Sequence, residues 1–268
     1  MRDRRRKNAS SSPSAPNAPG PIDLIIVGRN AIREVLRHSP HTLKSVWGSD
    51  EALKELEPDL RRARITAQRA NGETLSSWAH TDSHQGILGL LREERSTLDL
   101  PSLINSLESH PTATVLLLDS IYDPQNLGTL LRAAECFGVD AVIWSRNRGA
   151  PLSPVARKAS VGASELVPLV LVPNLAEAVE KLKQSSFWVV ALDGGEGGAL
   201  LGSFTFPERC VVVAGSEGRG VQPLLLKKAD FRVKIPLHGK IDSLNVSQAT
   251  SIALYELQLQ RTAVRRAE

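Results

Sequence analysis

The sequence predicts an α/β protein with two domains. One pattern recurs along the chain: an apolar, β-prone run ends in a polar or glycine-rich loop. In several cases a run with helical periodicity follows the loop. With 268 residues the chain has room for two domains, and its hydrophobic content of 41% is ordinary for a globular protein. No apolar run is long enough to span a bilayer, so we expect no membrane partner.

Residues 1–22 form a basic tail. Its charged residues are Arg2, Asp3, Arg4, Arg5, Arg6 and Lys7. Together they carry the whole formal net charge of +4, so the rest of the chain is neutral. The Arg-rich and then Ser/Pro/Ala/Asn-rich composition predicts disorder. A phosphate-binding arm, an organellar transit peptide and an inert extension all remain open, although no amphipathic helix is visible. We expect a cytoplasmic protein, with organellar targeting by the tail left open.

The sequence of residues 23–91 predicts a small α/β domain. Residues 27–36 form a short strand that enters a helix, with Ala31, Ile32, Val35 and Leu36 on one face. Residues 84–91 form a closing strand. The charged and then proline-containing stretch 92–109 is predicted to be a linker to a second domain, residues 110–268.

The second domain opens with an apolar strand at 114–118, a turn at 119–125 and a helix that starts near Asn126. Arg132 lies six residues further on, so the two side chains are offset by more than one helical turn. We expect both to reach one pocket, because Asn126 is at the helix start and Arg132 is long. Asn126 could instead be the helix N-cap.

Residues 210–220 form a buried strand that ends in Gly-x-Glu-Gly-x-Gly. Glycines let the backbone approach a ligand closely. Glu217 does not suit a phosphate cradle, because a carboxylate repels phosphate. It suits a cationic or hydroxyl-bearing ligand, and the alternative is an ordinary turn carboxylate.

A third segment, residues 231–250, contains a strand end, a polar loop and the start of a helix that runs to about Arg261. Backbone N–H groups at a helix start can hold an anion or polar ligand. Ser243 and Asn245 fit such a site, but either could simply cap the helix.

The two cysteines, Cys136 and Cys210, lie in apolar surroundings, which favours packing over a disulfide. No Cys/His cluster has metal-ligand spacing, so we expect no metal site.

Taken in order, these three segments resemble the signature motifs of the SpoU/TrmH-like RNA ribose methyltransferases of the SPOUT superfamily. The resemblance spans roughly residues 111–261. It implies a SPOUT α/β domain with a C-terminal trefoil knot, preceded by a small L30e-like α/β RNA substrate-binding domain at 23–91. It also implies a homodimer.

The resemblance further implies methylation of an RNA ribose 2′-hydroxyl with S-adenosylmethionine as cofactor. The catalytic residues it implies are Asn126, Arg132, Glu217, Ser243 and Asn245. Arg132 would grip the substrate phosphate and stabilise a developing alkoxide, because a charged guanidinium is a poor base. The implied cofactor-binding residues are Leu192, Gly215, Ser216, Glu217, Gly218, Ile235, Leu237 and Leu244.

The substrate implied is RNA. The pattern is most similar to that of bacterial enzymes that methylate a guanosine in large-subunit ribosomal RNA, with transfer RNA as the alternative. Gln248 and residues 120–122 depart from the usual pattern of these enzymes. A catalytically silent RNA-binding or ribosome-assembly protein of the same fold is a second hypothesis. The intact Asn126, Arg132, Glu217 and Asn245 argue against it.

Overall fold

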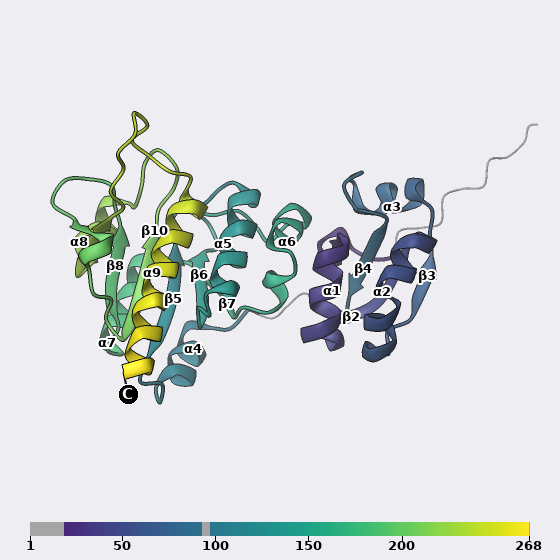
Figure 1. Cartoon of the computed structure of the whole chain (residues 1–268), viewed down its shortest axis with the longest axis horizontal. Coiled ribbons are helices and arrows are strands. Elements are labelled where there is room, and N and C mark those ends of the chain that lie inside the picture. Colours follow the sequence, from purple (N-terminus) through teal and green to yellow (C-terminus); the bar gives the residue numbers. More distant parts are fainter. Residues whose placement is uncertain (1–18, 93–96, 268) are drawn as a thin grey trace, which may run out of the picture.

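The computed structural model describes residues 19–92 and 97–267 of the chain. These residues form two units, each built around its own sheet (Figure 1). The predicted disorder of the basic tail concerns residues that lie almost entirely outside the described part.

The smaller unit contains a four-stranded sheet in the order β1-β4-β2-β3. Its strands are β1 (Ile25–Val27), β2 (Leu43–Gly48), β3 (Ala67–Arg69) and β4 (Ile87–Leu91). Helices α1 (Arg29–His38) and α2 (Asp50–Ala63) bury one face of the sheet, and α3 (Gly72–Ala79) covers the other. The predicted apolar face of α1, from Ala31 to Leu36, is buried, which confirms that prediction.

The larger unit contains a seven-stranded sheet in the order β7-β6-β5-β10-β8-β11-β9, in which every neighbouring pair is parallel. Its strands are β5 (Ala113–Leu118), β6 (Ala141–Ser145), β7 (Leu169–Val172), β8 (Trp188–Leu192), β9 (Ala199–Leu200), β10 (Arg209–Ala214) and β11 (Phe231–Lys234). The central strands read as continuous apolar runs because helices cover both faces. The predicted α/β class is therefore confirmed, with a parallel sheet in the larger unit.

Helices cover the two faces of this sheet unequally. α4 (Leu100–Leu107), α7 (Leu175–Gln184) and α8 (Pro223–Lys228) pack on one face. α5 (Pro124–Cys136), α6 (Pro154–Ser160) and the 22-residue α9 (Val246–Ala267) pack on the other. α9 extends beyond its predicted end at Arg261.

The predicted linker at 92–109 needs correction. Asp99 caps α4 by accepting a hydrogen bond from the Ser102 N–H at 2.7 Å, and Leu100, Leu103 and Leu107 of α4 are buried against the seven-stranded sheet. Leu98 N–H also bonds to Leu169 O at 2.9 Å. Residues 97–109 therefore belong to the larger unit, because three leucines at helical spacing outweigh the charge and proline content of the stretch.

The C-terminal helix is fixed at both sides. Its Gln258 Nε2 donates to Phe137 O at 2.5 Å, and its Gln260 Nε2 donates to Phe204 O at 2.8 Å. Gln260 Oε1 in turn accepts from Phe206 N at 2.9 Å. α9 is thus held between the end of α5 and the segment that leads into β10.

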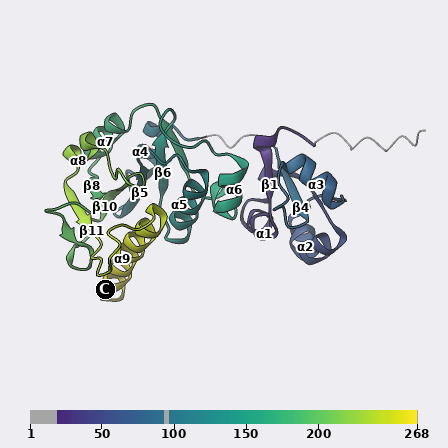
Figure 2. The same cartoon turned by 90° about the horizontal axis from the view of Figure 1, so that it is seen from above.

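The two units meet where α6 faces β1 and α1 (Figure 2). Gly162 lies at the centre of this junction with a φ of +92°, and a Cβ there would lie 3.0 Å from Ala31 O and 3.1 Å from Glu34 Cβ. The junction therefore needs glycine at this position, both for its backbone conformation and for the close approach.

Candidate functional site

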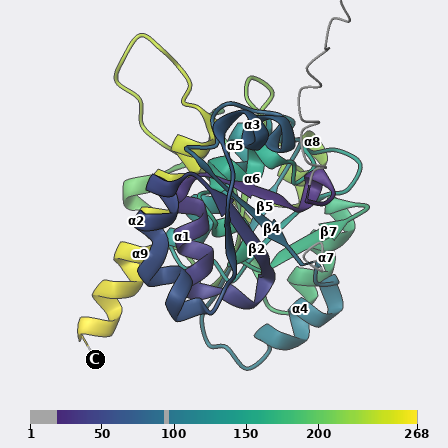
Figure 3. The ribbon, with the colours of Figure 1, turned by 90° about the vertical axis from the view of Figure 1, so that its right-hand side faces the viewer.

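The loops that follow three neighbouring strands surround a cavity of about 230 Å³. Because β8, β10 and β11 are parallel, their carboxyl ends lie at the same edge of the sheet, where ligands bind in open α/β sheets. Residues 192–194, 214–218 and 220 form part of the cavity wall. The long loop from β11 to α9 supplies the rest, and Figure 3 shows it as a yellow-green loop standing out from the body of the molecule.

Every residue predicted to bind a cofactor lines this cavity. These are Leu192, Gly215, Ser216, Glu217, Gly218, Ile235, Leu237 and Leu244, and the predicted catalytic residue Ser243 lines it too. Sequence reasoning missed further lining residues, namely Asp193, Gly194, Lys234, Asp242 and Thr250. Asp193, Gly194, Lys234 and Asp242 lie within two positions of predicted residues in the sequence, whereas Thr250 lies further along, within α9.

Asn245 joins the three sequence segments. Its Nδ2 donates to Asn126 Oδ1 at 2.9 Å and also to Glu217 Oε1. Residues 119 and 28 positions away in the sequence therefore meet at one amide. This contact brings together one side chain from each of the three predicted motifs.

Of the two asparagines that could have been helix N-caps, only Asn245 is one. Asn245 does cap α9, because its Oδ1 accepts from the Ser247 N–H at 2.9 Å. With its Oδ1 in this bond, Asn245 has its Nδ2 free to donate to Asn126 and Glu217. Asn245 therefore caps α9 and also connects the three motifs. Asn126 is not a cap: α5 begins earlier, at Pro124, with Asp123 accepting from the Gln125 N–H at 2.9 Å.

The glycine-rich loop is closed by two backbone hydrogen bonds between Ser216 and Gly220, at 3.0 and 2.9 Å. Gly215 packs so closely against this turn that a Cβ would lie 2.1 Å from Gly220 C. Gly218 has a φ of +79° and open space around its Cα. The loop thus presents the Glu217 carboxylate on a tight turn with room for a ligand beside it.

Asp119 anchors the far end of this loop, a role that sequence reasoning did not assign. Its carboxylate is fully buried and accepts from Gln222 N at 2.7 Å and from Gln222 Nε2 at 2.9 Å. A buried carboxylate must be satisfied by such donors. An aspartate directly after a buried strand was the available signal.

Arg132 lies apart from this cluster. It is exposed on α5, does not line the cavity, and makes no hydrogen bond or ion pair within residues 19–92 and 97–267. The six-residue spacing from Asn126 places it round the helix, so the expectation that both side chains reach one pocket is not met within this chain.

The cavity wall carries three acidic side chains, Asp193, Glu217 and Asp242, against one basic side chain, Lys234. An acidic wall suits a ligand with a positive charge. In the described part of the chain, no group of three or more His, Cys, Asp and Glu could hold a metal ion. No described helix has the length and apolar character needed to cross a membrane.

Comparison with known proteins assigns both units. Residues 113–255 match the SpoU rRNA methylase family, and residues 25–96 match the RNA 2′-O ribose methyltransferase substrate-binding family. The chain is 36% identical to the 23S rRNA (guanosine-2′-O-)-methyltransferase RlmB of Pseudomonas putida, over 90% of this chain and 98% of that protein. It is 37% identical to the protein of the same description from Yersinia pestis, over 88% and 97% of the two chains.

Solved structures share the fold. The SpoU methyltransferase AviRb from Streptomyces viridochromogenes, in complex with the cofactor AdoMet, has a TM-score of 0.70 at 20% identity, covering 89% of this chain and 90% of that one. An RNA 2′-O ribose methyltransferase has a TM-score of 0.72 at 24% identity, covering 89% and 88%. With the family match over more than half of the sequence and full-length relatives above 30% identity, the chain belongs to the SpoU rRNA methylase family.

Proposed function

We propose that this protein methylates the ribose 2′-hydroxyl of a guanosine in 23S ribosomal RNA in the cytoplasm, with S-adenosylmethionine as cofactor. The observation that carries the proposal is the meeting of Asn126, Glu217 and Asn245 beside the cavity at the carboxyl edge of the sheet. The RlmB relatives support the choice of substrate, since they cover nearly the full chain.

The cavity suits S-adenosylmethionine in its chemistry. The acidic excess of the wall matches the positive sulfonium and amino groups. Leu192, Ile235, Leu237 and Leu244 offer an apolar slot for adenine, and Leu237 and Leu244 are 40% and 37% exposed. The glycine-rich loop offers backbone groups for the polar parts. When bound, the cofactor supplies an electrophilic methyl group on sulfur.

The protein's own residues would have to orient a ribose and accept the proton of its 2′-hydroxyl. Glu217 and Asn126 are held by Asn245, so they present fixed acceptors to a hydroxyl. Arg132 lies outside this cluster within one chain. We assign it the role that the resemblance implies, which is to grip substrate phosphate and stabilise developing negative charge, because a guanidinium is a poor base. Ser243 lines the cavity wall, as Glu217 does.

The domain division is part of the proposal. Residues 23–91 act as an L30e-like RNA-binding domain, supported by the α/β/α arrangement around the sheet β1-β4-β2-β3. The larger unit carries a trefoil knot at its C-terminal end. Two observations support the knot. Gln260 of α9 is hydrogen-bonded to the backbone of Phe204 and Phe206, and β10 lies between β5 and β8 in the sheet.

A homodimer completes the proposal. Of the apolar residues on α9, Leu254 is buried in the core, but Ile252, Tyr255 and Leu259 are 41%, 54% and 46% exposed. Tyr255 and Leu259 border a broad groove of about 980 Å³ that also includes Phe137 of the α5 end. A second copy would cover this face. Sedimentation should show a dimer for the wild type and a monomer for Leu259→Arg.

The proposed reaction is tested by incubating the full-length protein with S-adenosylmethionine and protein-free 23S ribosomal RNA, then mapping ribose methylation. We expect modification at one guanosine. Calorimetric titration with the cofactor alone should show binding. If the protein neither bound the cofactor nor transferred a methyl group to any RNA, the result would instead favour a catalytically silent RNA-binding protein.

A further inference from the structure

Tyr122 is an exposed aromatic residue that the proposed reaction does not use. It lies on the turn between β5 and α5, where its side chain is 64% exposed while its neighbour Ile121 is 4% exposed. Burial therefore does not account for a large aromatic residue at this position. The turn also leads into Pro124 and Asn126, so Tyr122 is close in the sequence to the proposed methylation site.

The turn that carries Tyr122 is held from two sides. Ser120 has a left-handed φ of +60°, and its hydroxyl donates to Asp119 Oδ1 at 3.0 Å and accepts from Gln222 Nε2 at 2.7 Å. Ile121 O accepts from Ala150 N at 2.7 Å. A ring on such a fixed turn loses little backbone freedom when a ligand binds to it.

The next strand, β6, ends in a loop that carries Arg148. Ser145 Oγ accepts from the N–H groups of Asn147 and Arg148, at 3.2 and 3.1 Å, which shapes this loop. Arg148 Nη1 donates to Gln222 Oε1 at 3.3 Å. No ion pair to Arg148 occurs within the described ranges, so a neutral amide positions the guanidinium and leaves its charge uncompensated.

These groups share one edge with the site. Strands β6, β5 and β10 are neighbours, so the Arg148 loop, the Tyr122 turn and the Glu217 loop follow one another along the carboxyl edge. Gln222 bonds to both Arg148 and Ser120, so it links all three loops directly. Bases stack on aromatic rings, and guanidinium groups bind phosphate in a forked geometry.

We propose that Tyr122 and Arg148 form a subsite for a nucleotide next to the methylated one, in which the base stacks on the Tyr122 ring and Arg148 binds the phosphate. The inference rests on the proposed function, because it presumes that RNA enters at this edge. Every base has a face that can stack, so the subsite supplies affinity and orientation and does not select a base.

The test measures the affinity of full-length variants for protein-free 23S ribosomal RNA over a range of salt concentrations. Tyr122→Ala should weaken binding about tenfold, whereas Tyr122→Phe should keep it, because stacking needs only the ring. Arg148→Gln should lower the slope of log affinity against log salt by about 1, and Tyr122→Ala should leave that slope unchanged. Cofactor affinity should be the same in all variants.

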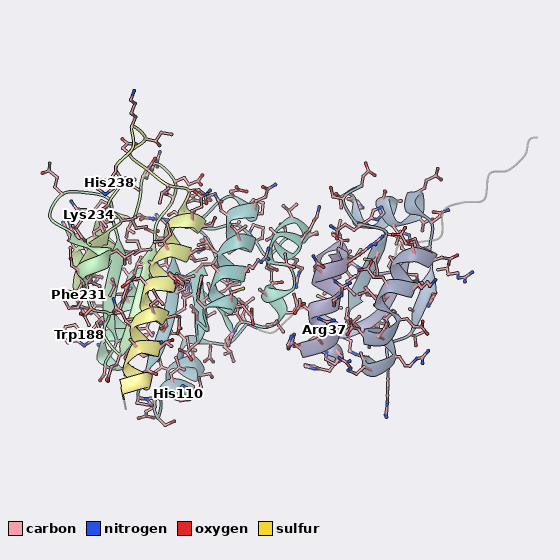
Figure 4. All side chains as sticks on the ribbon, in the orientation of Figure 1. Arg37, His110, Trp188, Phe231, Lys234 and His238 are labelled. Atoms are coloured by element: carbon pink, nitrogen blue, oxygen red, sulfur yellow. The ribbon has the colours of Figure 1, made fainter. Side chains whose placement is uncertain are left out.

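Trp188→Ala is the matched control. Trp188 is 52% exposed but begins β8, so it lies at the amino edge of the sheet, below Lys234 and His238 in Figure 4. Its replacement should not change RNA affinity. Wild-type affinity for Tyr122→Ala, or equal losses for Tyr122→Ala and Trp188→Ala, would overturn the subsite. Methyl transfer by the wild type is scored separately, so failure of the proposed function and failure of the subsite are distinct results.

Discussion

The arginines of α1 in the smaller unit differ in their partners from three exposed arginines of the larger unit. On the smaller unit, Arg29, Arg33 and Arg37 of α1 each face carboxylates of α2. Arg29 bonds to Glu51 at 3.0 Å and to Glu55 at 2.7 Å, Arg33 also bonds to Glu55, and Arg37 bonds to Asp59 at 3.1 Å.

On the larger unit, two exposed arginines in the loop after β6 and one on α5 have no such partners. Arg132, Arg146 and Arg148 make no ion pair within the described ranges. An arginine paired across two helices contributes to the fold, whereas an unpaired arginine on a fixed frame is free to bind phosphate. The comparison predicts that the first group affects stability and the second affects RNA binding and catalysis.

The largest effect should come from an arginine that is paired and also buried. Arg157 of α6 and Glu165 are 3% and 4% exposed and form an ion pair with each other. Arg157→Ala would leave the Glu165 carboxylate buried without its counter-charge, so we expect a loss of about 3–5 kcal/mol in the free energy of unfolding. Urea denaturation measures this. A loss below about 1 kcal/mol, as expected for an exposed pair, would show that the burial carries no such penalty.

Asn245 allows the capping and catalytic roles to be separated. Asn245→Asp keeps an oxygen that can accept from the Ser247 N–H, so α9 stays capped. It replaces the donor that holds Asn126 and Glu217 by a carboxylate that repels Glu217. We expect methyl transfer to fall about 100-fold while the melting temperature changes little. Asn245→Ala, which loses the cap as well, should reduce both.

How far the sequence predicts the molecule depends on whether a feature is local. The apolar face of α1 follows from helical periodicity, and the strands at 114–118 and 210–214 follow from apolar runs; the structure confirms all three. α4 was missed because its three leucines stand between charged and proline-rich residues. α5 begins at Pro124, two residues before the predicted start at Asn126. The reason is that Asp123 acts as the N-cap and Pro124 suits the first helical position.

For the site, the sequence motifs identify which residues matter, but not which of them touch. The cofactor residues were predicted and all line one cavity. The Asn126–Asn245–Glu217 contact and the Asp119–Gln222 anchor join residues 28 to 119 positions apart, so no local pattern could reveal them. The isolation of Arg132 likewise depends on helix geometry and packing.

The smallest expected effect concerns pH and the paired arginines of the smaller unit. Hydrogen bonds from Arg33 and then Arg29 lower the pKa of Glu55 below its ordinary value of 4.5. A lowered pKa means that the folded state prefers the carboxylate, so this stabilisation is present above pH 4.5 and is lost as the pH falls through the folded-state value. Melting temperatures from pH 7 to pH 3 should fall less for Glu55→Gln than for the wild type. If the melting temperatures of both proteins fell equally from pH 7 to pH 3, the proposed stabilisation by the ionised Glu55 would be contradicted.

The comparison between the units is tested most directly by measuring methyl transfer to 23S ribosomal RNA and melting temperature for Arg132→Gln and Arg33→Gln. Arg132→Gln should lose turnover by about 100-fold or more with an unchanged melting temperature and unchanged cofactor affinity, and Arg132→Lys should fail as well. Arg33→Gln should keep turnover and lose only about 1 kcal/mol of stability or less. Near-normal turnover in Arg132→Gln, or a loss of turnover in Arg33→Gln as large as that in Arg132→Gln, would contradict the account.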